Sequence, residues 1–256
     1  MASTVYVITG TNKGIGLGLL KALLARPSTT IVASVRNEEA AASLRSAIAD
    51  VARGNDTELH IMLLDFTKAP TPAAVIEAFK RATLGTIDRV DVLISNAASP
   101  FPMTPTHATS AEDLRSAFEI NTIAPLMVFQ GLWPLMEKSR GPGNVSAKFI
   151  GITSSVGSIG SQELFPAGAY GPSKAALNWL IMSLHVQHES LISLAIHPGW
   201  VQTYMGNYAA KEWNYEAGPP DTIDSSVNGV LAVMDGATRE TTSGKFVTQT
   251  GQVLPW

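Results

Sequence analysis

The sequence has 256 residues, of which 45% are hydrophobic and 15% charged, with a formal net charge of −3 and no cysteine. Such a chain can bury a large core, which excludes wholesale disorder, and its charge balance argues against nucleic acid or an anionic membrane as the main partner. The lack of cysteine excludes disulfides, cysteine-ligated metal centres and cysteine nucleophiles. The chain has neither a leader-like start nor a run of about 18 apolar residues, so we expect a cytoplasmic protein without a membrane span.

Short apolar runs alternate with helical patterns along the chain. The patterns predict strands at 5–8, 30–34, 59–64, 90–95, 149–153, 191–196 and 246–248, and helices at 15–24, 38–51, 73–84, 111–138, 169–188 and 225–234. Pro125 and Pro134 predict kinks or a break in the longest helix, and Gly141-Pro142-Gly143 predicts a turn. The regular alternation predicts an α/β fold of the Rossmann type. We expect one domain over residues 1–256, with a doubly wound parallel sheet of about seven strands and helices on both faces.

A glycine-rich turn follows the first predicted strand directly. It reads Thr9-Gly10-Thr11-Asn12-Lys13-Gly14-Ile15-Gly16. Glycines let the backbone turn sharply and approach a pyrophosphate closely, and the next helix offers its positive N-terminal end. The position between a strand and a helix favours a dinucleotide site over an ordinary connecting turn.

With this turn as its first motif, the chain resembles the short-chain dehydrogenase/reductase family. Further matches are Leu64-Asp65-Phe66-Thr67 after the third strand and Pro198-Gly199 after the sixth, while Asn96-Ala97-Ala98 stands where the family has Asn-Ala-Gly. The resemblance implies a nicotinamide cofactor. The residues it implies as cofactor contacts are Gly10, Asn12, Lys13, Gly14, Ile15, Gly16, Arg36, Asn37, Asp65, Phe66, Asn96, Ala97, Tyr170, Lys174, Pro198, Gly199, Val201 and Thr203.

The end of the second strand indicates which nicotinamide cofactor is bound. An NAD site places a carboxylate there, but the residues present are Arg36 and Asn37, and the first acid is Glu38. Arg36 is placed to donate a pair of hydrogen bonds to a 2′-phosphate, and Lys13 adds a second positive charge near the same position. These residues predict NADP(H), against the alternative that both cations are solvated surface charges.

Tyr170-Gly171-Pro172-Ser173-Lys174 resembles the family's catalytic Tyr-x3-Lys. The two side chains share one helical face, and a nearby ammonium is expected to lower the pKa of the phenol towards neutrality. Ser155 aligns with the catalytic serine of the family, with its neighbour Ser154 as the alternative. Asn121 matches the family's asparagine, which would support a water-linked proton path to Lys174; the alternative is a helix-interior amide bonded to backbone.

Aromatic residues and methionine crowd the segment after the sixth strand, which in the family is a mobile substrate lid, at about 200–220. They favour an apolar, ring-containing substrate, against the alternative of ordinary helix packing. A small insertion around 161–166 is expected at the substrate mouth. The candidate substrate contacts are Phe101, Phe165, Trp200, Tyr204, Met205 and Tyr208.

The tail from Ser243 to Trp256 resembles a branch of the family that includes fungal norsolorinic-acid ketoreductase and small carbonyl reductases. Together with the motifs above, it predicts NADPH-dependent reduction of an aromatic or polyketide-like ketone to an alcohol. The alternatives are a nucleotide-binding redox sensor or scaffold without turnover, and a dehydratase or cyclase on the same fold. The family also implies a homodimer or homotetramer, and no metal site is expected, because His185 and His188 lack a third ligand.

Overall fold

The computed structural model describes residues 3–139 and 146–256. Eight strands form one sheet in the order β3-β2-β1-β4-β5-β6-β7-β8. Their bounds are β1 (Thr4–Thr9), β2 (Thr29–Val35), β3 (Glu58–Leu63), β4 (Val92–Ser95), β5 (Ala147–Ile152), β6 (Leu191–His197), β7 (Phe246–Thr248) and β8 (Val253–Leu254). The predicted Rossmann-type parallel sheet is confirmed, with β8 added as an antiparallel edge strand. The predicted turn at residues 141–143 lies outside the described residues.

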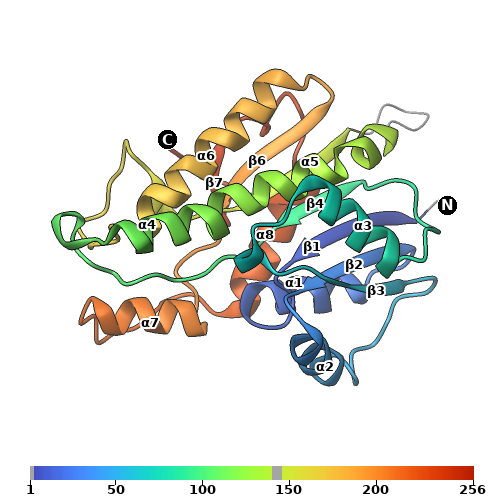
Figure 1. Ribbon diagram of the computed structural model, residues 1–256, viewed down its shortest axis with the longest axis horizontal. Helices are drawn as coiled ribbons and strands as arrows, with labels where there is room; N and C mark the ends of the chain where they lie inside the picture. The colour runs from blue at the N-terminus through green and yellow to red at the C-terminus, as the bar shows by residue number, and fades with distance from the viewer. Residues whose placement is uncertain (1–2, 140–145) are drawn as a thin grey trace.

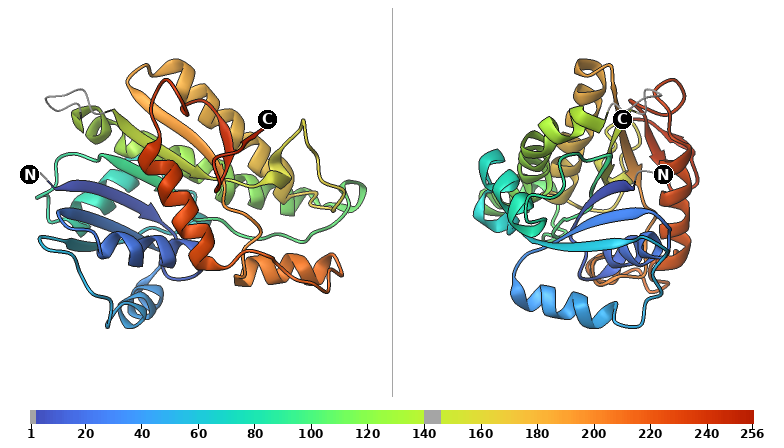
Figure 2. Two further views of the ribbon diagram at one scale, coloured as in Figure 1. Left: turned by 180° about the vertical axis from the view of Figure 1, so that it is seen from behind. Right: turned by 90° about the vertical axis from the view of Figure 1, so that its right-hand side faces the viewer.

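Helices cover both faces of the sheet (Figures 1 and 2). Their bounds are α1 (Gly14–Leu24), α2 (Glu38–Ala47), α3 (Pro72–Ala82), α4 (Ala111–Phe118), α5 (Ala124–Met136), α6 (Tyr170–Gln187), α7 (Tyr204–Glu212) and α8 (Ile223–Gly236). Five of these helices begin after a side chain that accepts a backbone N–H, which stabilises each start by about 1 kcal/mol. The caps are Asn37, Thr71, Ser110, Thr203 and Thr222. No helix within the described residues is long and apolar enough to cross a membrane.

Two buried clusters lie on opposite faces of the sheet, and successive residues of β1 alternate between them. Ile8 packs in one cluster with residues of α1 and α8, and Val7 packs in the other with residues of α3, α5 and α6. A strand buried on both faces needs apolar residues at every position. This explains why β1 and β2 read as continuous apolar runs rather than as alternating patterns.

The long helix predicted at 111–138 is interrupted. Residues Glu119–Ile123 form a π-helical turn between α4 and α5, whereas Pro134 sits inside α5 without ending it. Pro125 lies in the first turn of α5, where its missing N–H is not needed. The interruption therefore falls before both prolines. Such π turns occur frequently at functional sites.

The order of the strands defines where a ligand can bind. The chain builds outward from β1 to β3 and then returns to β4 on the other side of β1, so the direction reverses between β1 and β4. In open α/β sheets, the crevice at the carboxyl ends of such strands receives the ligand. Beyond these ends lie α7 and the segment 158–169 that precedes α6 (Figure 1).

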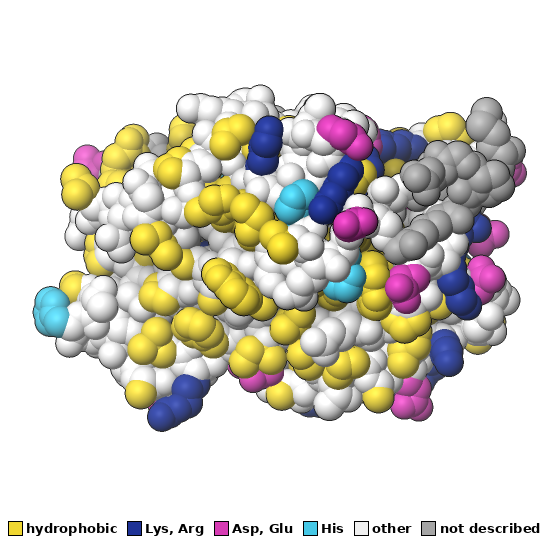
Figure 3. All heavy atoms as spheres, turned by 90° about the horizontal axis from the view of Figure 1, so that it is seen from above, with side chains coloured by type: hydrophobic (Ala, Val, Ile, Leu, Met, Phe, Trp, Pro, Cys, Tyr) yellow, Lys and Arg dark blue, Asp and Glu magenta, His cyan; other side chains and the backbone are white. Residues whose placement is uncertain are grey.

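Hydrophobic side chains gather on the face that α5 and α6 form (Figure 3). On this face Trp179 is 67% exposed and Val186 is 68% exposed. A shallow groove lies beside them between the two helices. It is lined by Leu126, Phe129, Gln130, Trp133, Trp179, Leu180, Ser183, Leu184, Gln187 and His188.

Candidate active site

The glycine-rich turn forms a cradle that side chains would fill. Gly10 has a φ of +72°, and a Cβ there would lie 2.8 Å from the Cα of Ala97. A Cβ on Gly16 would lie 2.1 Å from the carbonyl oxygen of Gly10. Only glycine therefore fits either position. The turn leads into α1, whose N-cap residue Lys13 makes no side-chain capping hydrogen bond, so the helix start is open to an anion.

Hydrogen bonds fasten this turn to the end of β4. The Asn96 side chain donates to the carbonyl oxygens of Thr9 at 2.9 Å and Gly10 at 3.1 Å. The Thr9 hydroxyl accepts the backbone N–H groups of Asn96 and Ala97, both at 3.0 Å. These bonds join the ends of β1 and β4, the two strands that flank the reversal point.

A cavity of about 450 Å³, which we call the glycine-turn cavity, opens beside this cradle. Most of the predicted cofactor contacts line it, together with two predicted substrate contacts, Tyr204 and Met205. The predicted cofactor contacts are Gly10, Asn12, Lys13, Gly14, Ile15, Gly16, Asn96, Ala97, Tyr170, Lys174, Pro198 and Thr203. The remaining lining residues, none of them predicted as a contact, are Ala98, Pro100, Ile152, Thr153, Gln202, Asn207 and Ile223.

Four predicted cofactor contacts follow β2 and β3 and lie outside this cavity. Asn37 caps α2, its Oδ1 accepting the N–H of Ala40 at 2.9 Å, and Phe66 is buried in the core. Arg36 is exposed and close enough to Asp65 for their charges to interact. Burial alone would raise the pKa of Asp65. The hydrogen bonds from Thr67 and the charges of Lys68 and Arg36 together outweigh burial, so the pKa lies below its ordinary value. Asp65, which follows β3, is therefore an acid near Arg36, although the end of β2 itself has none before Glu38.

Lys13 and Tyr204 contact each other across the mouth of the glycine-turn cavity. The Lys13 Nζ lies 5.3 Å from the centre of the Tyr204 ring, within the range of a cation–π interaction. Tyr204 is largely exposed at the start of α7. The contact therefore joins the glycine turn to the start of α7.

Tyr170 and Lys174 occupy the first turn of α6, and both side chains are buried. The Lys174 Nζ donates to the carbonyl oxygen of Ile152 at 3.0 Å and lies 5.7 Å from the centre of the Tyr170 ring. Burial lowers the pKa of Lys174 to about 8. Burial also raises the pKa of Tyr170 to about 12, against a smaller opposing effect of its hydrogen bond with Ser154. The expected lowering of the Tyr170 pKa by Lys174 is therefore wrong, because desolvation dominates.

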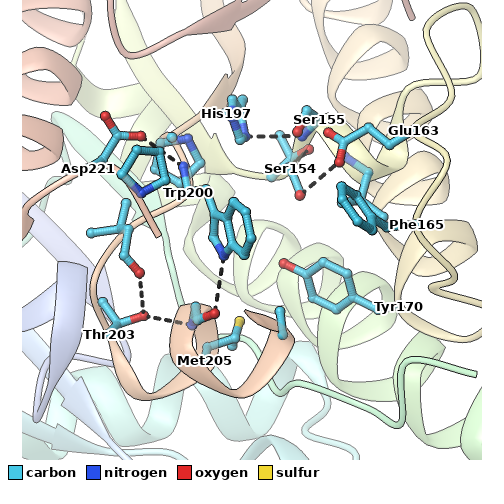
Figure 4. A pocket seen from close by; sticks show the side chains of 18 of the residues that line it. Ser154, Ser155, Glu163, Phe165, Tyr170, His197, Trp200, Thr203, Met205 and Asp221 are labelled. Atoms are coloured by element: carbon cyan, nitrogen blue, oxygen red, sulfur yellow. Dashed lines mark hydrogen bonds between the residues drawn. The ribbon is translucent and has the colours of Figure 1, made fainter. Parts of the chain in front are cut away.

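Ser154, rather than Ser155, faces the Tyr170 side chain. The two side chains point toward each other (Figure 4), and the contact with Ser154 opposes the rise in the pKa of Tyr170. Ser155 begins a 3-10 turn, and its backbone N–H donates to the Nδ1 of His197 at 3.1 Å. The structure therefore favours the alternative, Ser154, as the serine that faces Tyr170. Which of the two serines takes part in catalysis stays a prediction.

Asn121 lies in the π-helical turn and is fully buried. Its side chain accepts the N–H of Ser99 at 3.0 Å, donates to the carbonyl of Ser99 at 3.2 Å, and donates to the hydroxyl of Ser173 at 3.1 Å. It therefore joins the segment after β4 to the first turn of α6. The bonds to Ser99 fit a helix amide bonded to backbone, and the water-linked path to Lys174 stays a prediction.

A second cavity, of about 370 Å³, lies between α7 and the segment 158–169; we call it the aromatic cavity. The rings of Phe165 and Trp213 stack with their centres 4.7 Å apart, and Trp200 meets Trp213 edge-on at 5.6 Å. Of the predicted substrate contacts, Phe165, Trp200 and Met205 line it, whereas Phe101 and Tyr208 line neither cavity. Gly199 and Val201, predicted as cofactor contacts, line this cavity instead.

Two residues of the aromatic cavity carry polar roles that the sequence did not indicate. An Asp221 carboxylate oxygen accepts the backbone N–H of Trp200 at 2.9 Å, and a Cβ on Gly199 would clash with the same carboxylate. The Nδ1 of His197 accepts the Ser155 N–H, and burial lowers the pKa of His197 to about 4. A single sequence carries no signal for either contact, since each joins segments that only the fold brings together.

Comparisons with known proteins agree with this geometry. The short chain dehydrogenase family model matches residues 4–214. The short-chain dehydrogenase RED3 of Pyricularia oryzae is 37% identical, covering 99% of each chain. A norsolorinic acid ketoreductase of Aspergillus parasiticus is 34% identical, covering 99% of this chain and 91% of its own. The crystal structure of the NADPH-bound carbonyl reductase from chicken fatty liver has a TM-score of 0.83 at 29% identity, covering 100% of this chain and 95% of that one.

The chain therefore belongs to the short-chain dehydrogenase family of oxidoreductases. The resemblance to fungal norsolorinic acid ketoreductases and to carbonyl reductases, expected from its motifs and its tail, is confirmed.

Proposed function

We propose that this protein is an NADPH-dependent ketoreductase that reduces an apolar, aromatic ketone to the alcohol, with Tyr170 as the proton donor. The observation that carries the proposal is that Tyr170 lines both the glycine-turn cavity and the aromatic cavity. A reductant in the first cavity and a ketone in the second would meet at its phenol.

The residues of the glycine-turn cavity suit a dinucleotide. The cradle left by Gly10 and Gly16 lets the backbone approach a pyrophosphate, and the open start of α1 favours its charge. Lys13 and Arg36 supply two cations that favour the additional 2′-phosphate of NADP(H) over NAD, although Asp65 partly offsets Arg36. When bound, the cofactor would supply the hydride.

Side chains of this protein would stabilise and then protonate the negatively charged ketone oxygen. The Ser154 hydroxyl would donate a hydrogen bond to this oxygen as negative charge develops. Tyr170, with a pKa of about 12, keeps its proton at neutral pH and so has one to give. Lys174 carries its ammonium below its pKa of about 8 and would hold the nicotinamide ribose. Asn121 would position the segments that carry these groups, and its water-linked path to Lys174 stays a prediction.

The aromatic cavity supports a substrate with rings. Its stacked walls and the thioether of Met205 favour flat, apolar ligands. We propose that the segment 200–220, which includes α7, acts as the lid over this substrate. The ketoreductases among the relatives, named for norsolorinic acid, are consistent with a polyketide-like ketone.

The proposed assembly is argued from the exposed apolar surface of the protein. The apolar face of α5 and α6 offers Trp179 and Val186 to a second copy of the chain, which supports a homodimer or homotetramer. A cytoplasmic location and a single domain over residues 1–256 stay predictions.

Stoichiometry separates this function from its alternatives. The purified protein would be incubated with NADPH and a panel of aryl ketones and quinones, and NADPH absorbance would be followed beside product masses. A ketoreductase consumes one NADPH for each alcohol formed. A sensor or scaffold would bind NADPH without consuming it. A dehydratase or cyclase would convert substrate without consuming NADPH in proportion to the product.

A further inference from the structure

Glu163 places a carboxylate in the otherwise apolar wall of the aromatic cavity. It lies in the segment before α6 and is partly buried, while its neighbours Gln162 and Leu164 are exposed. Figure 4 shows it on the same side of the cavity as Ser154 and Phe165. The chain therefore turns an acidic side chain inward and an apolar one outward, the reverse of what solvation alone would favour.

Glu163 has no hydrogen-bond or ion-pair partner among residues 3–139 and 146–256. The other titratable groups at this cavity do not neutralise the negative charge of Glu163. Asp221 is a second carboxylate, engaged by the Trp200 N–H, and burial keeps His197 neutral above a pKa of about 4. Neither lysine nor arginine is among the described residues that line the cavity. Its electrostatic character is thus negative.

A partly buried carboxylate without a protein partner calls for a hydrogen-bond donor from the ligand. Around it, the faces and edges of Phe165, Trp200 and Trp213 suit a flat ring system, and Tyr170 with Ser154 would take the ketone oxygen. A ligand that fills the cavity therefore needs a carbonyl at the phenol, aromatic rings along the wall, and a donor group facing Glu163.

We propose that Glu163 selects aromatic ketones that carry a hydroxyl group away from the carbonyl, and that it excludes anionic ones. The selection rests on the proposed ketone reduction. The Glu163 carboxylate accepts a charge-assisted hydrogen bond from the substrate hydroxyl, which a methoxy group cannot donate. A carboxylate on the substrate would be repelled by the like charge of Glu163.

Three derivatives of acetonaphthone test the selection: one with a hydroxyl, one with a methoxy and one with a carboxylate group on the distal ring. Wild type is expected to prefer the hydroxy ketone over the methoxy ketone in kcat/KM by about 10- to 100-fold. Glu163→Leu should remove this preference, while Glu163→Gln, which still accepts a hydrogen bond, should keep part of it. Both variants should improve kcat/KM for the carboxylate. Gln162→Leu, on the exposed neighbour, is the matched control and should change none of these ratios.

Isothermal titration calorimetry on the same proteins with NADP⁺ measures binding without turnover, so it separates this inference from the proposed reduction. If no ketone is reduced but the hydroxy ketone binds wild type more tightly than Glu163→Leu, the proposed function fails and the selection holds. If wild type does not bind the hydroxy ketone, or if it treats the hydroxy and methoxy ketones alike, the selection is overturned.

Discussion

The phenol of Tyr170 and the hydroxyl of Ser154 face each other at the carboxyl ends of the central strands (Figure 4). Tyr170 lines both cavities and Ser154 lines the aromatic one, so a carbonyl oxygen that contacts both would lie at the inner end of the aromatic cavity. Two hydroxyl donors converging on one oxygen make a site for developing negative charge. The catalytic account rests on this pair.

Replacing each serine in turn tests which of them belongs to the pair. Ser154→Ala removes a donor to the developing charge and should lower kcat for ketone reduction by about 100- to 1,000-fold. Ser155→Ala keeps the backbone N–H that donates to His197 and should cost less than about tenfold. Steady-state kinetics on both variants decides the matter, and the reverse order of the two losses would restore Ser155.

Arg36 should determine the preference for the phosphorylated cofactor. Arg36→Ala removes a charged donor to the 2′-phosphate and is expected to raise KM for NADPH by about 10- to 100-fold, leaving KM for NADH nearly unchanged. Arg45→Ala, an exposed arginine on α2, serves as the control. Equal KM values for NADPH in wild type and Arg36→Ala would remove Arg36 from the cofactor site.

His197 should make the fold sensitive to acid. The pKa of His197 is about 4 in the folded chain against an ordinary 6.5, so the unfolded chain binds more protons between these values. Stability is therefore full above about pH 6.5 and falls as the pH drops towards 4, by on the order of 2 kcal/mol. Urea unfolding at about pH 7 and about pH 5 measures this loss.

The control for this prediction is His197→Asn, which keeps an acceptor for the Ser155 N–H but cannot take up a proton. It should lose less stability than wild type over the same interval. An identical loss in both proteins would show that other groups cause the acid sensitivity.

The features predicted well from sequence are those fixed by local chemistry. Val7 and Ile8 predicted a strand buried on both faces, and Gly10 and Gly16 predicted a turn that admits no side chain, because periodicity and backbone freedom act within a few residues. The Tyr170–Lys174 pair was predicted for the same reason, since positions four apart share a helical face.

The features predicted poorly depend on neighbours distant in the chain. The choice between Ser154 and Ser155 depends on the direction of each side chain after the end of β5. The raised pKa of Tyr170 depends on burial that no local pattern reports. The contact of Asp221 with Trp200 joins two segments across a loop. The π-helical turn at Asn121 was mistaken for a kink caused by prolines, because prolines nearby gave the stronger local signal.

The most direct test of the account measures NADPH oxidation with an aryl ketone by wild type and Tyr170→Phe. Wild type should consume NADPH as alcohol forms, and Tyr170→Phe, which lacks the proton donor, should be slower by about 100- to 10,000-fold. Tyr6→Phe is a matched control, because Tyr6 is also buried but lines neither cavity; it should keep its activity. Reduction by Tyr170→Phe at the wild-type rate would contradict the account.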